Sequence, residues 1–499
     1  MSTRKVVRKS DNSGVKFKKS FKPGTGNKPF QKEAKKRPPR ERTGTNEPPA
    51  KKSNNPNLEP LGERRNDNEP TEKKEARRRF KQKSQKQIAY EREKRASIVV
   101  APKLKERVGV KVLDNDDDEK VPYCSHGPCL LFEKPFSRES SNVDISYSCA
   151  VYRSDKCDYK LDIIDWNKIK DEYTPPEHEC EPFEYGQASK SYKELSEQGK
   201  EIFFCETCWK CFNKHSCPMI GPINYDLVNN PLEFLVNAIQ ENEGEAQYWF
   251  KDETHEIIYN GIKKGDFDGL LCIGTPTVFQ KLRTRMRCFL LDVDERFKYF
   301  FEADEFAQFS MLVNYFYDPK GREQLENFFR ETRRLLILCD PPFAVFISAL
   351  QKSIDKLKAF FKEKSEYDDK EVYQMFVLPV FVGKHLRDVE MLDYKVIYSN
   401  HRVFNNPDRT IVRLFTDVEQ TNFELPEPYY RFCSECNRYV VSTNEHCDIC
   451  EKCPSKDGST YKHCFTCERC VKPKYVHCKR CKCCHLPGRC NPKPQQSCF

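Results

Sequence analysis

Between residues 225 and 425, short apolar runs alternate with amphipathic stretches along the chain. Five runs have the length of a buried strand, and the segments between them are long enough to hold helices. The runs are GLLCIG (269–274), CFLLDVD (288–294), LLILCD (335–340), MFVLPVF (375–381) and IVRLF (411–415). This alternation is typical of a parallel sheet with crossover helices. We therefore predict that residues 225–425 form an α/β domain with a Rossmann-like sheet.

Candidate binding residues lie at the ends of the first three runs. These are Gly274, Asp292 and Asp340. In open α/β sheets, ligands bind outside the carboxyl ends of the strands, where a glycine permits close approach of the backbone and an acid commonly binds ribose hydroxyls. This order suits S-adenosylmethionine as the cofactor. Asp294 is the alternative to Asp292 as the acid that binds the ribose. Asp292 could instead be a solvated residue at the end of a strand, with no ligand.

The third run ends in Asp-Pro-Pro-Phe, residues 340–343. Asp340 could accept one hydrogen of an exocyclic amine, while Pro341 and Pro342 fix the turn and leave carbonyl oxygens for the other hydrogen. Phe343 offers a face to a purine, a contact worth about 1–3 kcal/mol per stacked base. This ending resembles the signature of enzymes that methylate the amino group of adenine. A strand that merely turns on two prolines is the alternative.

Composition narrows the class of protein. The chain of 499 residues has 86 Lys and Arg against 76 Asp and Glu, a net charge of +10 that suits a nucleic-acid partner. No apolar stretch approaches the roughly 20 residues of a membrane span, and the N-terminus is polar, so we expect no signal peptide and no membrane partner. With 26 cysteines and no secretory signal, we expect thiolate–zinc sites in an intracellular protein.

Residues 1–118 are rich in Lys, Arg, Pro, Asn and Ser and contain few large apolar side chains. Such a segment cannot bury enough surface to offset its ordering entropy. We predict a disordered basic tail with a dense basic run at 73–87. The run could serve as a nuclear or nucleolar address that also contacts phosphates, or it could be a solvated tail.

Residues 119–170 contain cysteine and histidine residues that could close one tetrahedral zinc site. The set is Cys124, His126, Cys149 and Cys157. With the His-Gly-Pro turn at 126–128 and Trp166, the segment resembles a GRF-type zinc finger, although SYSC replaces the glycine-arginine-phenylalanine core. The resemblance implies binding of single-stranded nucleic acid. Phe132, Tyr147 and Trp166 could offer stacking faces, or they could belong to the core of the finger.

A second small zinc finger, with a linker, is expected in residues 171–224. Its most specific feature is the knuckle Cys205-x2-Cys208. His215 and Cys217 fit best as the remaining ligands. Two alternatives stay open, because Cys211 could replace one of them and His178 with Cys180 could complete a site instead.

Residues 426–499 contain the most regular feature of the chain. A His-Cys-x2-Cys-x2-Cys unit recurs three times, an internal repeat typical of a linear array. Interleaving of neighbouring units gives four closed Cys3His sites of the structural type. The sets are Cys433, Cys436, His446 and Cys453; Cys447, Cys450, His463 and Cys470; Cys464, Cys467, His477 and Cys484; and Cys478, Cys481, His485 and Cys490. With the two fingers, this predicts about six zinc ions at four ligands each.

The cysteine spacing from 433 to 470 also resembles the cysteine-rich domain of protein palmitoyltransferases. Three observations oppose that function. The chain has no membrane span, Tyr461-Lys462-His463-Cys464 stands where Asp-His-His-Cys would be, and the repeat uses Cys464 as a zinc ligand. We therefore reject a palmitoyltransferase.

The order of these parts resembles one family, the CCHC-type zinc-finger ribosomal RNA N6-adenosine methyltransferases. Further similarity lies in AQYWF (246–250), LCIGTP (271–276), MLDY (391–394) and HCFTCERCVKPKYVHC (463–478), and it runs from about 121 to 490. The resemblance implies a class I methyltransferase sheet and methylation of one adenosine in large-subunit ribosomal RNA. It implies that residues 340–343 hold the adenine, and that the cofactor site is lined by Gln247, Tyr248, Trp249, Phe250, Gly274 and Asp292.

The resemblance also implies partners and a location. Ribosomal RNA is the expected partner, and ribosome-assembly proteins are further possible partners. The expected location is the nucleus or nucleolus, with the cytoplasm as a second location. The target adenosine would leave its stack to enter the pocket.

Two other functions stay open. One is a non-catalytic RNA-binding ribosome-assembly factor on a methyltransferase fold, and the other is a DNA adenine methyltransferase.

Overall fold

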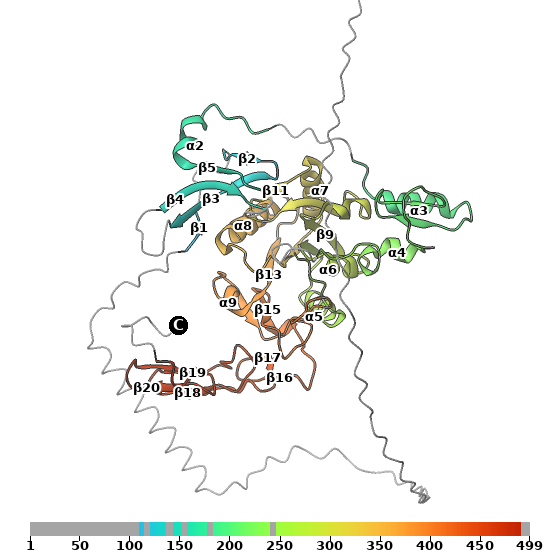
Figure 1. Ribbon diagram of the computed structural model, residues 1–499. Coiled ribbons are helices and arrows are strands. Elements are labelled where there is room, and N and C mark those ends of the chain that lie inside the picture. Colours follow the sequence, from blue (N-terminus) through green and yellow to red (C-terminus); the bar gives the residue numbers. More distant parts are fainter. Residues whose placement is uncertain are drawn as a thin grey trace, which may run out of the picture. The chain divides into compact units, whose positions relative to one another are not determined.

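The computed structural model describes residues 109–113, 120–135, 143–151, 157–176, 183–239 and 246–490 (Figure 1). All of them belong to one compact unit, residues 86–499. The basic run at 73–87, most of the predicted tail, and the alternative ligands His178 and Cys180 lie outside the described residues. Within the described part of the chain, no helix combines the length and apolarity that crossing a membrane requires.

An eight-stranded sheet forms the centre of the α/β domain, with the strand order β11-β10-β9-β8-β12-β13-β15-β14. The strands are β8 (Gly269–Ile273), β9 (Arg287–Asp292), β10 (Phe306–Ser310), β11 (Tyr315–Phe316), β12 (Arg334–Cys339), β13 (Glu371–Pro379), β14 (Glu390–Leu392) and β15 (Val412–Thr416). The five strands from β10 to β13 in this order run parallel. The predicted Rossmann-like α/β fold is confirmed.

One part of the sheet differs from the prediction. The run at 411–415 forms β15, which pairs antiparallel with both β13 and β14. Between β13 and β15 the chain forms only the four-residue helix α9 (Val380–Gly383) and β14. An antiparallel neighbour needs no crossover helix, so this edge of the sheet is mixed. The end of the run at 375–381 belongs to α9 and not to the strand.

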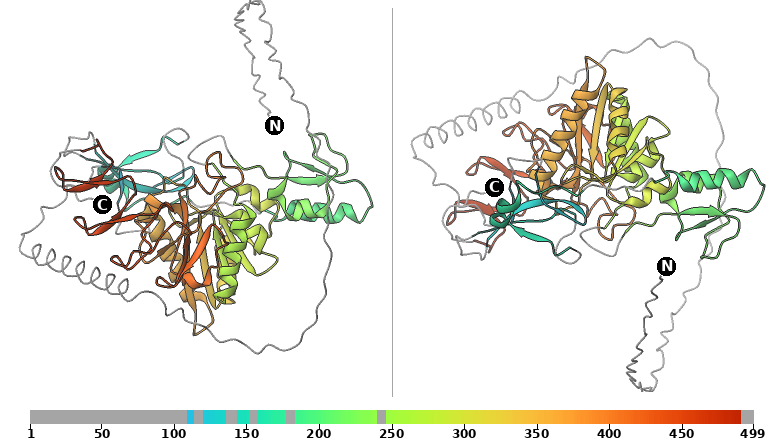
Figure 2. Two further views of the ribbon diagram at one scale, coloured as in Figure 1. Left: turned by 90° about the horizontal axis from the view of Figure 1, so that it is seen from below. Right: turned by 90° about the horizontal axis from the view of Figure 1, so that it is seen from above.

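Helices cover both faces of the sheet (Figure 2). Leu270, Leu290 and Leu336 face one buried cluster, and alternate residues of the same strands face a second. Because both faces are covered, the central strands are apolar throughout. The first cluster includes residues of α5 and α6, and the second includes residues of α7 and α8. The helical elements are α5 (Asp252–Lys264), α6 (Pro276–Leu282), η2 (Glu295–Tyr299), α7 (Pro319–Arg330), α8 (Ile347–Lys364) and η3 (Gln420–Asn422).

The first finger is a small sheet followed by a helix. Its strands follow the order β1-β3-β4-β5, and β2 also pairs with β3. The elements are β1 (Lys111–Val112), β2 (Tyr123–Cys124), β3 (Gly127–Pro135), β4 (Val143–Cys149), β5 (Lys160–Asp162) and α2 (Ile163–Ile169). Asp162 caps α2, because its carboxylate accepts the Ile164 N–H. Strand β1 lies in the segment that the sequence assigned to the tail.

The other small modules are built on two-stranded hairpins. The second finger contains α3 (Gln187–Ser196), β6 (Phe203–Cys205), β7 (Lys210–Phe212), α4 (Tyr225–Asn229) and η1 (Pro231–Glu233). The C-terminal array contains β16 (Tyr430–Cys433), β17 (Arg438–Val441), β18 (Lys462–Cys464), β19 (Arg469–Val471), β20 (Val476–Cys478) and β21 (Cys483–His485). These hairpins are short, and small modules of this kind commonly take stability from bound metal because they cannot build a large core.

Candidate active site and metal centres

Two predicted site residues meet where the strand order of the sheet reverses. The chain continues from β8 to β9 on one side and later returns to β12 on the other side of β8. Gly274 follows β8, and Asp340 follows β12. Gly274 has φ +64°, and a Cβ atom there would lie 3.0 Å from the carbonyl oxygen of Asp340. The Asp340 N–H donates to the Ile273 carbonyl oxygen at 3.1 Å, so the two turns are in direct contact.

The carboxylate of Asp340 has a defined partner. The hydroxyl of Tyr398 donates to it and lies 3.3 Å from each carboxylate oxygen. Burial raises the pKa of Asp340 well above its usual value, and the Tyr398 hydroxyl partly opposes this by stabilising the ionised form. Of the two prolines that follow, Pro341 is buried and Pro342 is exposed.

Aromatic side chains surround Phe343, which is partly exposed. Its ring centroid lies 6.3 Å from that of Tyr248 and 6.0 Å from that of Phe404. His401 stacks on Phe404 at 4.2 Å. Ring faces beside a carboxylate suit a flat base with an exocyclic amine. Sequence reasoning missed Tyr398, His401 and Phe404, because no periodicity marks the loop that carries them.

The predicted cofactor segment 246–250 is held by segment 397–400. Trp249 N–H donates to Asn400 Oδ1 at 2.8 Å, and Asn400 Nδ2 donates to the Gln247 carbonyl oxygen at 3.0 Å. Phe250 is buried, forms an isolated β-bridge with Tyr398 and stacks on its ring. Segment 246–250 therefore lies beside the carboxylate of Asp340.

Segment 246–250 also contacts the acidic end of β9. Gln247 Nε2 donates to Asp294 Oδ2 at 2.9 Å, and Asp294 forms an ion pair with Arg296 at 2.6 Å. Asp292 is buried and accepts the Asp294 N–H at 3.0 Å. Burial, followed by the charge of Asp294, raises the pKa of Asp292 to about 7. Because Asp294 is engaged by Arg296 and Gln247, Asp292 is the better candidate for a ribose ligand.

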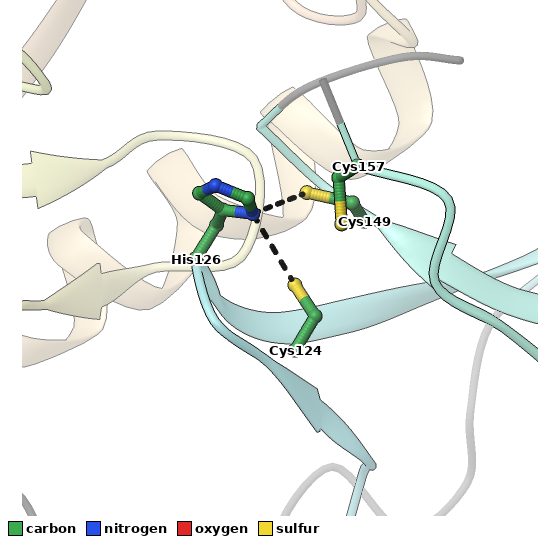
Figure 3. A group of neighbouring side chains, drawn as sticks. All are labelled: Cys124, His126, Cys149 and Cys157. Carbon is green, nitrogen blue, oxygen red and sulfur yellow. Dashed lines mark hydrogen bonds between the residues drawn. The ribbon is translucent and has the colours of Figure 1, made fainter. Parts of the chain in front are cut away.

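The structure brings the four cysteine and histidine residues of the first finger together. The nitrogen His126 Nδ1 lies 4.0 Å from Cys124 Sγ and 3.8 Å from Cys149 Sγ, with Cys157 beside them (Figure 3). All four ligand atoms lie within 4.8 Å of one another. Zinc–sulfur bonds of about 2.3 Å in a tetrahedron place neighbouring ligand atoms about 3.8 Å apart. The donor set and its spacing therefore fit zinc.

The second finger brings together Cys205, Cys208, His215 and Cys217. The shortest contact is 3.1 Å, between Cys208 Sγ and His215 Nε2. Cys211 is buried outside this group, and its thiol donates to the Ala188 carbonyl oxygen at 3.4 Å. The alternative in which Cys211 acts as a ligand is therefore not found.

The array brings its predicted sets together in the interleaved order. The first three sets have all ligand atoms within 4.8 Å. In the last set, Cys478 Sγ lies 3.6 Å from Cys490 Sγ. The backbone N–H of Cys481, with help from His485, lowers the pKa of Cys478 to about 6, so this thiol ionises readily for a metal.

Five of the candidate zinc sites begin with a Cys-x2-Cys pair, and these five pairs share one backbone feature. The residue after the second cysteine has a φ of about +50°, a conformation that costs a side chain roughly 1–2 kcal/mol. The residues are Trp209, Asn437, Glu451, Glu468 and Lys482. The spacing of the cysteines predicted the ligands, but not this conformation.

Of the two alternatives for the aromatic residues of the first finger, the structure shows the buried one. Phe132, Tyr147 and Trp166 are all buried, so none of them offers a face to a base. Tyr147 and Trp166 contact each other in the core of the finger, and Phe132 contacts Phe346 just before helix α8. The three rings stabilise the finger and its contact with the α/β domain.

The sheet, the glycine turn and the Asp-Pro-Pro-Phe ending together define an N6-adenine methyltransferase. A family model described as probable N6-adenine methyltransferase matches residues 241–433.

Comparison with curated proteins identifies the family more closely. The chain is 30% identical over 378 residues to the rRNA N(6)-adenosine-methyltransferase ZCCHC4 of Mus musculus, which covers 68% of this chain and 72% of that protein. It is 29% identical over 427 residues to the Homo sapiens protein of that name, covering 78% and 82%. The chain therefore belongs to the family of rRNA N6-adenosine methyltransferases. A shorter similarity, 27% identity over 138 residues, links 26% of the chain to 60% of EEF1A lysine methyltransferase 1 of Gallus gallus.

Proposed function

We propose that this protein transfers a methyl group from S-adenosylmethionine to N6 of one adenosine in large-subunit ribosomal RNA. The observation that carries the proposal is the meeting of Asp340 and Gly274 at the reversal of the strand order, with Phe343 beside them. This is where α/β enzymes bind their ligands. Membership of the family supports the same reaction and the same substrate class.

The residues at this edge fit S-adenosylmethionine. Gly274 leaves open a space that a Cβ atom would fill, and the carboxylate of Asp292 lies at the end of β9, where ribose hydroxyls are bound. Gln247, Tyr248, Trp249 and Phe250 would line the remainder of the cofactor site. When bound, the cofactor supplies an electrophilic methyl group on sulfur.

The side chains of segment 340–343 prepare the amine for attack. The lone pair of N6 is delocalised into the purine ring, so the amine has to be held and oriented. Asp340 accepts one N6 hydrogen, a proline carbonyl oxygen accepts the other, and Phe343 stacks on the ring. After transfer the product nitrogen is acidic, and its proton leaves to water or to Asp340. No residue forms a covalent intermediate.

The fingers and the array supply structure and RNA contacts. We propose six Cys3His zinc centres, which are closed and therefore structural. The fingers, the array and the basic tail bind ribosomal RNA around the target. They contact unpaired bases there, because side chains read unpaired bases better than the deep groove of an RNA duplex. A location in the nucleus or nucleolus, ribosome-assembly proteins as partners, and an effect on translation complete the proposal.

Substitution of Asp340 by alanine tests the reaction. Asp340→Ala should abolish methyl transfer to ribosomal RNA while RNA binding, measured by filter binding, stays unchanged. The matched control is Asp388→Ala, which removes an acid from the loop before β14 that takes no part in the site. If wild-type protein with its zinc bound takes up no S-adenosylmethionine, the non-catalytic assembly factor is the correct function. Faster transfer to DNA than to ribosomal RNA would identify a DNA methyltransferase.

A further inference from the structure

Segment 393–400 connects the first module of the array to the candidate active site. At its start, the Asp393 carboxylate accepts a hydrogen bond from Asn444 Nδ2 at 2.9 Å, and Asn444 belongs to that module. At its end, Asn400 Oδ1 accepts the Trp249 N–H at 2.8 Å. Tyr398 lies between these anchors and is therefore held from both sides.

The side chain of Tyr398 is fixed in one orientation. It is fully buried, and its ring stacks on Phe250 with centroids 5.1 Å apart and an interplanar angle of 21°. Its hydroxyl lies 3.3 Å from both carboxylate oxygens of Asp340. Among the described residues, Tyr398 is the one side chain that hydrogen-bonds to this carboxylate.

A carboxylate that orients an amine has to point in one direction and has to be ionised. Asp340 lies in a turn after a strand, where its side chain is free to rotate about χ1 and χ2 unless a partner fixes it. A single donor between both oxygens restricts this rotation and leaves lone pairs available to an N6 hydrogen.

We propose that Tyr398 is a positioning residue for Asp340, a role that rests on the proposed function. Its hydroxyl holds the carboxylate in the orientation that accepts the amine of adenine. Segment 393–400 carries this hydroxyl, and the first module of the array holds the segment in place. Tyr398 acts through Asp340 and contacts neither the methyl group nor the amine.

Electrostatics support the same role. Burial raises the pKa of Asp340, and the Tyr398 hydroxyl lowers it. The other titratable groups close to this pair are Cys339 on β12, Tyr248 in segment 246–250, and His401, whose ring lies 6.2 Å from that of Tyr398. Burial raises the pKa of the Cys339 thiol and lowers that of His401, so both are neutral near pH 7. The hydroxyl is thus the neighbour that favours the ionised form.

The test is Tyr398→Phe in the full-length, zinc-bound protein. The ring and its stacking remain, so affinities for S-adenosylmethionine and ribosomal RNA should change by less than about twofold. We expect kcat to fall by about 10- to 100-fold, the usual effect of losing a hydrogen bond to a charged group. The acid limb of the pH–rate profile should move to higher pH, because Asp340 without the hydroxyl holds its proton more tightly.

Tyr394→Phe is the matched control. Tyr394 lies in the same segment, is also buried, and its hydroxyl bonds to Thr254 Oγ1 at 3.1 Å, away from Asp340. This variant loses a comparable hydrogen bond and should keep kcat and the pH–rate profile. Incorporation of 3-fluorotyrosine at position 398 provides a second test, because a more acidic hydroxyl is a stronger donor and should move the acid limb to lower pH.

Two results would overturn the proposal. One is an unchanged acid limb in Tyr398→Phe, and the other is an equal loss of kcat in the Tyr394→Phe control. Inactivity of the wild-type protein would refute the proposed function separately. In that case, the pKa of Asp340 can still be measured by 13C NMR of the aspartate carboxyl groups, and it shows whether the Tyr398 hydroxyl acts on this carboxylate. The Asp340 signal is assigned by its absence in Asp340→Asn. A pKa of Asp340 that does not rise in Tyr398→Phe rules the coupling out.

Discussion

Gly274 combines two constraints that a side chain cannot meet. Its φ of +64° is unfavourable for other residues, and an added Cβ would lie 3.0 Å from both the Asp340 carbonyl oxygen and Met311 Cε. Gly199 has the same φ of +64° with nothing within 4 Å of the position of a Cβ. A comparison of alanine substitutions at the two glycines therefore distinguishes the cost of a positive φ from the cost of a steric clash.

We predict that Gly274→Ala lowers stability by more than the roughly 1–2 kcal/mol that the left-handed conformation alone costs. Gly199→Ala should lose only that amount. Gly274→Ala should also bind S-adenosylmethionine at least about tenfold more weakly, because the clash displaces Asp340. Urea unfolding and calorimetric titration measure both effects. Equal losses of stability, with normal cofactor binding in both variants, would contradict the close approach.

Asp292, the proposed ribose ligand, illustrates how a buried carboxylate lowers the stability of the free protein. Its pKa is raised from 3.8 to about 7, mainly by burial. Below about pH 4 both the folded and unfolded states are protonated there. As the pH rises from about 4 to 7, the unfolded state loses a proton that the folded state keeps, so the free energy of unfolding falls across this window.

We predict that Asp292→Asn removes this pH dependence, because the amide stays neutral. Without cofactor, the variant should be more stable than the wild type at pH 8 and similar to it at pH 4, while it binds S-adenosylmethionine more weakly. Asp294→Asn is the control, since it breaks the ion pair with Arg296 and should destabilise the protein at pH 8. Urea unfolding at both pH values measures the effect. Parallel pH profiles for wild type and Asp292→Asn would refute the assignment.

At the scale of elements, the contact between β17 and segment 393–400 joins the array to the α/β domain. Asp393 and Arg413 are both about 1% exposed, with 3.8 Å between Arg413 Nε and Asp393 Oδ1. The other carboxylate oxygen accepts from Asn444 Nδ2 and from the Val441 N–H. A buried charge needs such partners, and the loss of one is costly.

We predict that Asn444→Ala lowers the free energy of unfolding by about 1.5–3 kcal/mol, the range for a hydrogen bond to a charged group. It should also lower methylation, because segment 393–400 carries Tyr398. Zinc content should not change, since Asn444 is no ligand. Thr460→Ala in the same module removes an exposed hydroxyl that donates to the Thr443 carbonyl oxygen at 2.8 Å, and should cost less than about 0.5 kcal/mol. A loss of zinc in Asn444→Ala would mean that the module itself has unfolded.

At the scale of the whole molecule, the array divides into two halves of different charge. Residues 426–461 carry four basic and six acidic side chains, whereas residues 462–490 carry eight basic side chains and one acidic one. The first half contacts the α/β domain through Asn444 and through Arg438, whose guanidinium donates to the Met391 carbonyl oxygen. The second half is therefore better suited to the phosphates of RNA.

We predict that combined alanine substitution of Lys479, Arg480 and Lys482, all exposed, weakens binding to ribosomal RNA. The slope of log K against log salt concentration should fall by about 2, at about 0.7 per phosphate contact on a single strand. Substitution of the exposed Lys452 and Lys456 in the first half should change the slope by less than about 0.5 by the same relation. Filter binding at several salt concentrations measures both. A larger effect from the first-half variant would reverse the assignment of the two halves.

The sequence by itself determined the fold class, and it predicted the Cys/His groups and the strand ends of the candidate site that the structure brings together. Buried parallel strands have to be apolar throughout, so β8, β9 and β12 were visible as runs. A zinc site takes four ligands, which often lie close together in the sequence, so each set could be inferred from local spacing. Family membership rests on sequence similarity and needs no tertiary contact. The resemblance supplied segment 246–250, which no pattern of residues would have revealed.

Only the tertiary structure decided which side chains face one another. Tyr398 reaches Asp340 across 58 positions of the chain, and no local pattern encodes a contact between a loop and a strand end. The burial of Phe132 and Tyr147 and the antiparallel direction of β15 were likewise hidden. The sequence does not show whether an aromatic residue is exposed or buried, or whether a strand pairs in a parallel or an antiparallel direction. Packing between distant segments makes these choices, because it decides which surfaces leave water.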